Sequence, residues 1–104
     1  ILGAAIELKK EGYDPHPEIM VPLTGILYEF EAQEKVIRDA AAALFEKEGM
    51  EIPFKVGTMI EIPRAALTAN RIASRAEYFS FGTNDLTQMT FGYSRDDIAS
   101  FLPV

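Results

Sequence analysis

The sequence predicts an α/β fold of consecutive βα units whose strands are parallel, in the form of a partial (β/α)8 TIM-type barrel. Helical and strand patterns alternate along the 104 residues in the order α-β-α-β-α-β-α, as in right-handed βαβ units. The strand candidates are nearly continuous apolar runs, which is typical of strands covered by helices or enclosed in a barrel. A complete barrel takes about 250 residues, so this chain could supply about three βα units; a small open sheet fits the pattern equally well.

The first element is a helix over Leu2–Lys10, since two lysines fill its last turn and Gly12 follows. A turn cluster, "GYDPHP", separates it from a short apolar run, Glu18–Leu23, which has the length of a strand.

A long helix is predicted over Tyr28–Lys47, and Gly49 ends it. Its apolar residues recur at helical spacing on one stripe: Val36, Ile37, Ala40, Ala41, Leu44 and Phe45. The second strand follows over Phe54–Ile62 and is closed by Pro63. A lone glycine within it, Gly57, indicates a bulge or a close approach of another backbone.

The last third of the chain repeats the alternation. An alanine-rich helix is predicted over Arg64–Arg75, a strand over Ala76–Gly82, and helical turns over Asn84–Gly92. "SRDDIASFL", residues 94–102, predicts one more short helix with Ser94 as its N-cap.

Composition excludes several classes of function. The net charge is −6 and no basic cluster is present, which argues against nucleic acid as a partner. No apolar run approaches the ~20 residues that a bilayer crossing needs. Cysteine is absent, which excludes disulfides and a cysteine-ligated metal and fits a reducing compartment such as the cytoplasm.

Both ends of the sequence look cut. The chain begins at Ile1, already inside an apolar pattern, and ends at "ASFLPV", where a new apolar run has just begun. We therefore expect residues 1–104 to be a fragment of one barrel domain within a longer protein.

Polar residues follow two successive strands of the predicted sheet. Glu61 ends the second strand between two isoleucines, and Gly82, Thr83, Asn84 and Asp85 follow the third. The carboxyl ends of parallel strands share one rim, so Glu61 and Asp85 are predicted to face one mouth. Two carboxylates are hard oxygen ligands that suit Mg²⁺ or Mn²⁺.

The segment from Gly82 to Asp85 offers further binding groups. A glycine lets the backbone turn tightly and approach a ligand. Thr83 and Asn84 add side-chain hydrogen bonds, and the N–H groups of the following helix favour a small carboxylate or phosphate. The competing interpretation is that Asn84 or Asp85 is only an N-cap.

Two other polar residues are weaker candidates. His16 lies in a turn flanked by prolines and is interpreted as a solvated loop residue. Arg64, directly after Pro63, either reaches the rim or only begins a helix.

Two blocks, "GTMIEIPRAALTA" and "YFSFGTNDLTQMTFGYSRDD", together with "EIMVPL", resemble the C-terminal domain of the pyruvate, phosphate dikinases. These belong to the phosphoenolpyruvate-utilising enzymes, with phosphoenolpyruvate synthase and enzyme I of the sugar phosphotransferase system. The resemblance spans almost the whole chain, and "RAALTA" and "TQMTFGYSRDD" favour the dikinases over their relatives.

The resemblance implies a barrel that binds pyruvate or phosphoenolpyruvate with Mg²⁺. Glu61 and Asp85 would be the metal ligands, and Glu61, Gly82, Thr83, Asn84 and Asp85 would form the substrate contacts. The family reaction converts ATP, pyruvate and phosphate into AMP, diphosphate and phosphoenolpyruvate through a phosphohistidine carried by another domain; His16 does not match that histidine.

The family's proton-donating cysteine would lie beyond Val104, and its substrate-clamping arginines would precede Ile1. The segment is therefore expected to hold the metal half of the site, without a catalytic residue of its own, and not to turn over alone. Its partners would be the phosphohistidine and nucleotide-binding domains of the parent chain, itself expected to be a homodimer.

Alternatives remain open at this point. The segment could be the corresponding part of a phosphoenolpyruvate synthase, or a self-standing acidic α/β interaction module without catalysis. Location is expected to be cytoplasmic, or plastid if the source is a plant. In each case an open parallel sheet leaves unpaired edges, so the isolated piece is expected to self-associate.

Overall fold

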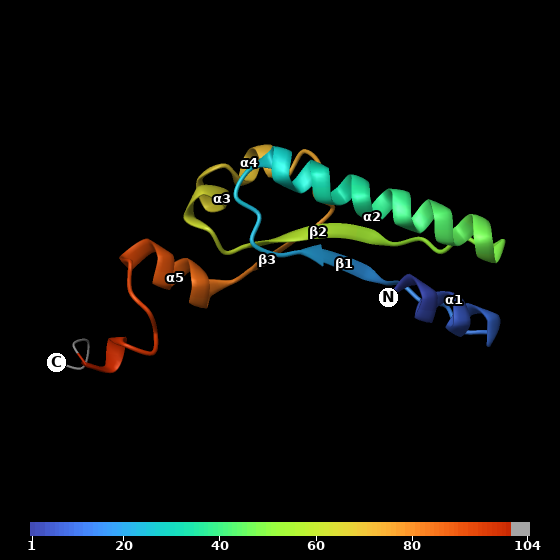
Figure 1. Cartoon of the computed structure of the whole chain (residues 1–104), viewed down its shortest axis with the longest axis horizontal. Helices are drawn as coiled ribbons and strands as arrows, with labels where there is room; N and C mark the ends of the chain where they lie inside the picture. The colour runs from blue at the N-terminus through green and yellow to red at the C-terminus, as the bar shows by residue number, and fades with distance from the viewer. Residues whose placement is uncertain (101–104) are drawn as a thin grey trace.

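The computed structural model describes residues 1–100 of the chain. Helices and strands alternate as the sequence predicts (Figure 1). In order they are α1 (Leu2–Lys10), β1 (Glu18–Val21), α2 (Leu27–Glu48), β2 (Lys55–Ile60), α3 (Pro63–Leu67), α4 (Ala69–Ile72), β3 (Phe79–Phe81), α5 (Thr83–Phe91) and the 3₁₀ helix η1 (Ile98–Ser100).

The three strands form one parallel sheet in the order β1-β2-β3. Val21 pairs with Thr58 at the end of β1, and Ile60 pairs with Phe81 at the end of β2. The predicted α/β class with a parallel sheet is thus confirmed. The register also places the residues that follow β2 and β3 at the same edge of the sheet.

Helices α2, α3 and α4 share one face of the sheet (Figure 1). Alternate residues of β2 point to that face, as the pleat requires. The buried cluster between helices and sheet consists of Val21, Phe30, Val56, Ile60, Ala65 and Ile72. A second, smaller cluster of Ala5, Ile6 and Ile52, with Leu44 and Phe45 packed against it, joins α1 to the far end of α2.

The helix predicted over residues 64–75 is two short helices, so that prediction is wrong. The chain breaks at Thr68, whose φ and ψ of −114° and 18° leave the helical region. Its Oγ1 donates to the carbonyl oxygen of Arg64 at 2.8 Å. Threonine competes in this way for backbone acceptors, which favours helix ends and bends.

All three strands are shorter than predicted. β1 stops at Val21 because Pro22 has no N–H to donate and Leu23 adopts a φ of 54°. The third strand begins at Phe79, after Glu77 has joined β2 with its own backbone N–H and its side chain. The helix predicted over 94–102 is a turn that ends in η1; residues 101 and 102 lie outside the described part.

An ionic network ties α2 to the segment before β3. The Glu34 carboxylate is buried and accepts from Nε and Nη2 of Arg75 at 3.2 and 2.8 Å. Arg38, one turn along α2, lies 3.5 Å from Glu34 and also pairs with Glu77. Because these contacts link residues about 40 positions apart, they fix α2 over the sheet.

Within residues 1–100, no helix combines the length and apolarity that a membrane crossing requires.

Candidate functional site

Glu61 follows the central strand and is buried, with 4% of its surface exposed. Its Oε1 accepts a hydrogen bond from the backbone N–H of Leu23 at 2.7 Å. The bond joins the end of β2 to the loop after β1, so the carboxylate lies at the shared rim rather than on a solvated surface.

The charge of Glu61 has no partner within the described residues. None of the ion pairs among residues 1–100 includes it, and its Oε2 makes no hydrogen bond. Every fully buried side-chain nitrogen or oxygen in this part of the chain has a partner, so Oε2 retains some access from outside. Burying a carboxylate is costly unless a cation compensates it, and the donor set therefore fits a bound cation.

Gly82 lies directly against this carboxylate. A Cβ atom at position 82 would stand 2.7 Å from the Cβ of Glu61 and 2.9 Å from its Oε2. The φ of Gly82 is −91°, which any residue can adopt, so the predicted tight turn is not what requires glycine here. Close approach of the loop to Glu61 requires it.

The three residues after Gly82 form the first turn of α5. Gly82 itself is the N-cap, and no side chain makes a capping bond, so the interpretation of Asn84 or Asp85 as the N-cap is wrong. Thr83 and Asn84 are exposed, and Asp85 is half-buried. The side chain of Asp85 makes no hydrogen bond or ion pair with any residue from 1 to 100, which leaves its carboxylate available.

The pairing of β2 with β3 thus brings Gly82, the single residue between β3 and α5, against Glu61. Within residues 1–100 no group of three or more His, Cys, Asp or Glu side chains converges. Mg²⁺ is commonly held in proteins by one or two carboxylates together with waters and substrate oxygens. The arrangement therefore places the buried carboxylate of Glu61 beside Gly82, the N-cap of α5, and leaves Asp85 in the first turn of that helix.

Two predicted weaker candidates lie outside this site. His16 is exposed and pairs with Asp14 at 3.0 Å, as a solvated turn residue would. Arg64 is the second residue of α3; its side chain is exposed and makes no hydrogen bond or ion pair with residues 1–100.

Two neighbours of Glu61 were not predicted from sequence. Leu23 contributes a backbone N–H, and Met59 places its sulfur 2.8 Å from the position of a Cβ on Gly82. The donor is the backbone N–H of Leu23, and since every residue except proline carries this group, the residue type gives no signal. The methionine at alternate spacing from Glu61 in the second strand was the one available signal.

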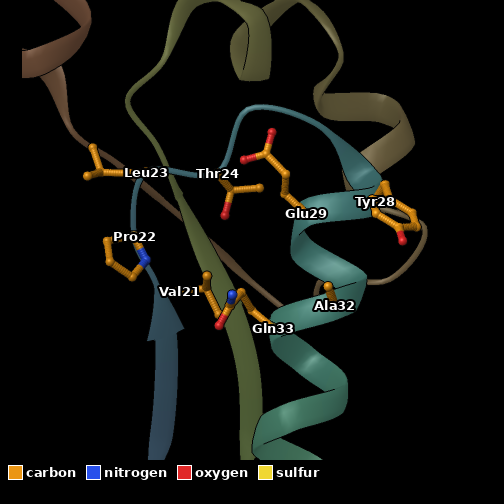
Figure 2. Close-up of a pocket in the computed structure, with 8 residues that line it drawn as sticks. All are labelled: Val21, Pro22, Leu23, Thr24, Tyr28, Glu29, Ala32 and Gln33. Carbon is orange, nitrogen blue, oxygen red and sulfur yellow. The ribbon is translucent and has the colours of Figure 1, made fainter.

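A hollow of about 490 Å³ lies beside the loop that carries Leu23 (Figure 2). Its wall is formed by Val21, Pro22, Leu23, Thr24, Tyr28, Glu29, Ala32 and Gln33. Neither Glu61 nor Asp85 lines it. Glu61 is therefore hydrogen-bonded to the loop that borders the hollow, but the hollow is separate from the candidate metal ligands.

Comparison with known proteins places the chain in a family. Residues 2–101 match the family described as PEP-utilising enzyme, PEP-binding domain. Over its whole length the chain is 58% identical to "Pyruvate, phosphate dikinase, chloroplastic" of Mesembryanthemum crystallinum. It is also 60% identical to "Pyruvate, phosphate dikinase 1, chloroplastic" of Oryza sativa subsp. japonica and 59% identical to the protein of that name in Zea mays. The chain spans 11% of the length of each of these relatives. With nearly every residue matched, the chain belongs to the phosphoenolpyruvate-utilising enzymes, in their PEP-binding domain.

Proposed function

We propose that this chain supplies the Mg²⁺-binding half of the phosphoenolpyruvate/pyruvate site of a pyruvate, phosphate dikinase. The observation that carries the proposal is Glu61, a buried carboxylate at the rim with no cationic partner among residues 1–100. Identity of 58–60% to three plant dikinases supports the parent activity over that of a phosphoenolpyruvate synthase. The three parallel strands would be part of a (β/α)8 barrel.

In this proposal Glu61 and Asp85 hold the ion. Gly82, Thr83 and Asn84 line the substrate, and the N–H groups that open α5 face its carboxylate or phosphate. When bound, Mg²⁺ supplies positive charge beside the substrate oxygens that gain negative charge during phosphoryl transfer. The residues of this chain would orient the substrate, and the coordination positions of Mg²⁺ that Glu61 and Asp85 do not fill would be left to substrate oxygens.

The parent reaction would convert ATP, pyruvate and phosphate into AMP, phosphoenolpyruvate and diphosphate. A phosphohistidine domain and a nucleotide-binding domain would be contributed by other parts of the parent, which we propose is a homodimer. The catalytic proton donor and the arginine clamp would also come from other parts of the parent, so the segment alone is expected to bind the ion without turnover. The word "chloroplastic" in the relatives' names supports a plastid location over the cytoplasm.

Metal titration of the chain tests the proposal. Glu61→Gln and Asp85→Asn should each abolish Mg²⁺ binding measured by isothermal titration calorimetry, because each removes one of two charged ligands. Glu46→Gln is the matched control, since Glu46 is exposed on α2, away from the rim.

Equal Mg²⁺ affinity in the unchanged chain, Glu61→Gln and Asp85→Asn would refute the metal site. Such a result, together with a melting temperature that Mg²⁺ leaves unchanged, would favour the acidic interaction module. In a parent enzyme, loss of pyruvate-dependent turnover in both variants would support the catalytic assignment.

A further inference from the structure

We propose that the backbone N–H of Leu23 and the missing side chain of Gly82 together make Glu61 a one-oxygen metal ligand. The N–H of Leu23 bonds to Oε1, and the absence of a side chain at Gly82 leaves Oε2 uncovered at the start of α5. Both are positioning residues, since they act through Glu61. The inference rests on the proposed metal site and adds how that site selects its ion.

The conformation of Leu23 is unusual. It is the one residue other than glycine with a positive φ, 54°, among residues 1–100. A left-handed conformation is unfavourable for a residue with a Cβ, and such outliers collect at functional sites where the surroundings enforce them. Here the turn aims the N–H of Leu23 at Glu61, and the two groups lie 2.7 Å apart (the loop is seen in Figure 2).

Oε2 of Glu61 lies so close to Gly82 that a side chain at position 82 would cover it. A methyl group there would stand 2.9 Å from Oε2 and 2.8 Å from the sulfur of Met59. Glycine is not required by the backbone, since its φ is −91°. Access to Oε2 is therefore the feature that glycine preserves at this close approach.

A carboxylate with one oxygen already bonded offers a single oxygen to an ion. Mg²⁺ and Mn²⁺ accept such ligands in octahedral sites, whereas Ca²⁺ takes more oxygens and often binds both oxygens of one carboxylate. The bond from Leu23 thus disfavours the two-oxygen mode. The backbone N–H of Leu23 would therefore make the site selective for Mg²⁺ and Mn²⁺ over the larger Ca²⁺.

Replacing that N–H with an ester oxygen tests the inference without changing the side chain. Leucic acid at position 23 should weaken Mn²⁺ binding to the full chain about tenfold or more, as loss of an outer-shell partner does. It should also raise the affinity for Ca²⁺ relative to Mn²⁺. The same substitution at Leu27 is the control, since Leu27 opens α2 and its N–H makes no bond to residues 1–100.

Gly82→Ala is a second, independent variant, expected to weaken Mn²⁺ binding with an unchanged circular dichroism spectrum. Gly3→Ala is its control, because a Cβ at Gly3 meets nothing within 4 Å.

The hydrogen bond itself can be tested by NMR without any metal. The amide proton of Leu23 should resonate downfield in the unchanged chain and move upfield in Glu61→Ala, which removes the acceptor.

The outcomes separate this inference from the proposed function. If Mn²⁺ binds the unchanged chain, is lost in Glu61→Gln, and binds the Leu23 ester and Gly82→Ala with unaltered affinity, the inference fails and the metal site stands. A Leu23 amide proton that does not respond to Glu61→Ala also overturns the inference alone. Failure of the unchanged chain to bind Mn²⁺ refutes both.

Discussion

Gly57 lies where two strands come too close for any side chain. A Cβ at this position would stand 2.5 Å from the carbonyl oxygen of Tyr78 and 2.6 Å from two of its ring carbons. Burial raises the pKa of the Tyr78 phenol, and the nearby negative charge of Glu18 adds to the effect. The ring is therefore packed over the middle of β2, and the glycine makes room for it.

Gly57→Ala should lower the free energy of unfolding by about 1–3 kcal/mol, the usual cost of forcing extra volume into a packed site. The carbonyl oxygen belongs to the backbone and cannot rotate away. Urea denaturation with Gly3→Ala as the control measures the difference, because Gly3 lies in open space on α1. A variant as stable as the unchanged chain would show that β3 can move aside.

At the residue scale, the sequence correctly predicted which polar residues follow the ends of β2 and β3. Glu61 was predicted at the rim because it ends a strand of a parallel sheet, and the carboxyl ends of parallel strands share one edge. For Gly57 the sequence predicted either a bulge or a close approach of another backbone, and the structure shows the close approach. Leu23 could not be predicted, since its φ of 54° accompanies a hydrogen bond to a side chain 38 positions away.

One buried acid links α2 to the segment that follows α4. Glu34 of α2 accepts two hydrogen bonds from Arg75, which follows α4, and its side chain is 6% exposed. Together with the pair between Arg38 and Glu77, this contact ties α2 to the end of the crossover that leads into β3.

Arg75→Met should destabilise the fold by about 1–3 kcal/mol, since a buried acceptor loses its donors. Arg38 stays close enough to limit the loss. Arg71→Met, on the exposed side of α4, is the matched control and is expected to stay within about 0.5 kcal/mol. Chemical denaturation of the three proteins checks the ranking, and equal midpoints would refute a structural role for Glu34.

Acid should weaken the same region through Glu77. The N–H of Val56 and then the guanidinium of Arg38 hold the pKa of Glu77 below its ordinary value of 4.5. A carboxyl whose pKa is lower in the folded state stabilises the fold above that value and loses its contribution as pH falls through the lowered pKa. Because 39% of the side chain is exposed, the effect should stay under about 1 kcal/mol.

Glu77→Gln should flatten the dependence of unfolding free energy on pH below about 4.5, the ordinary pKa of this carboxyl. Denaturation curves recorded from neutral to acidic pH provide the comparison. A variant with the same acid slope as the unchanged chain would assign the sensitivity to other carboxylates.

Element boundaries were predictable only where the stop signals are local. The helix predicted over residues 2–10 has those bounds, and α2 extends one residue further at each end than predicted. Its end is marked by Gly49, which adopts the left-handed conformation. The break at Thr68 was missed because an apolar stripe continues across it, and the periodicity alone does not register a side chain that competes for a carbonyl.

The described part of the molecule is elongated, with extents of 59 × 28 × 17 Å. The sheet carries helices on one face, and β1 and β3 are each paired on one side only within residues 1–100 (Figure 1). Periodicity predicted the parallel order. A (β/α)8 barrel needs eight strands, five more than the three that residues 1–100 form.

Self-association of the isolated chain is the expected result of these free edges. Light scattering should give a mass above 11.6 kDa at high concentration. Met20→Lys places a charge on the exposed edge strand and should lower that mass, whereas Glu46→Lys on α2 should not. A monodisperse monomer at every concentration would contradict the prediction.

The unequal support of the strands has a thermal consequence. β2 has neighbours on both sides, whereas β3 has three residues and one neighbour. On warming, fraying should start at β3 and, in the proposed metal site, separate Asp85 from Glu61 while the central strand is still intact. Any ion bridging the two would then be released before the chain melts, and its presence would delay the first step of melting more than the last.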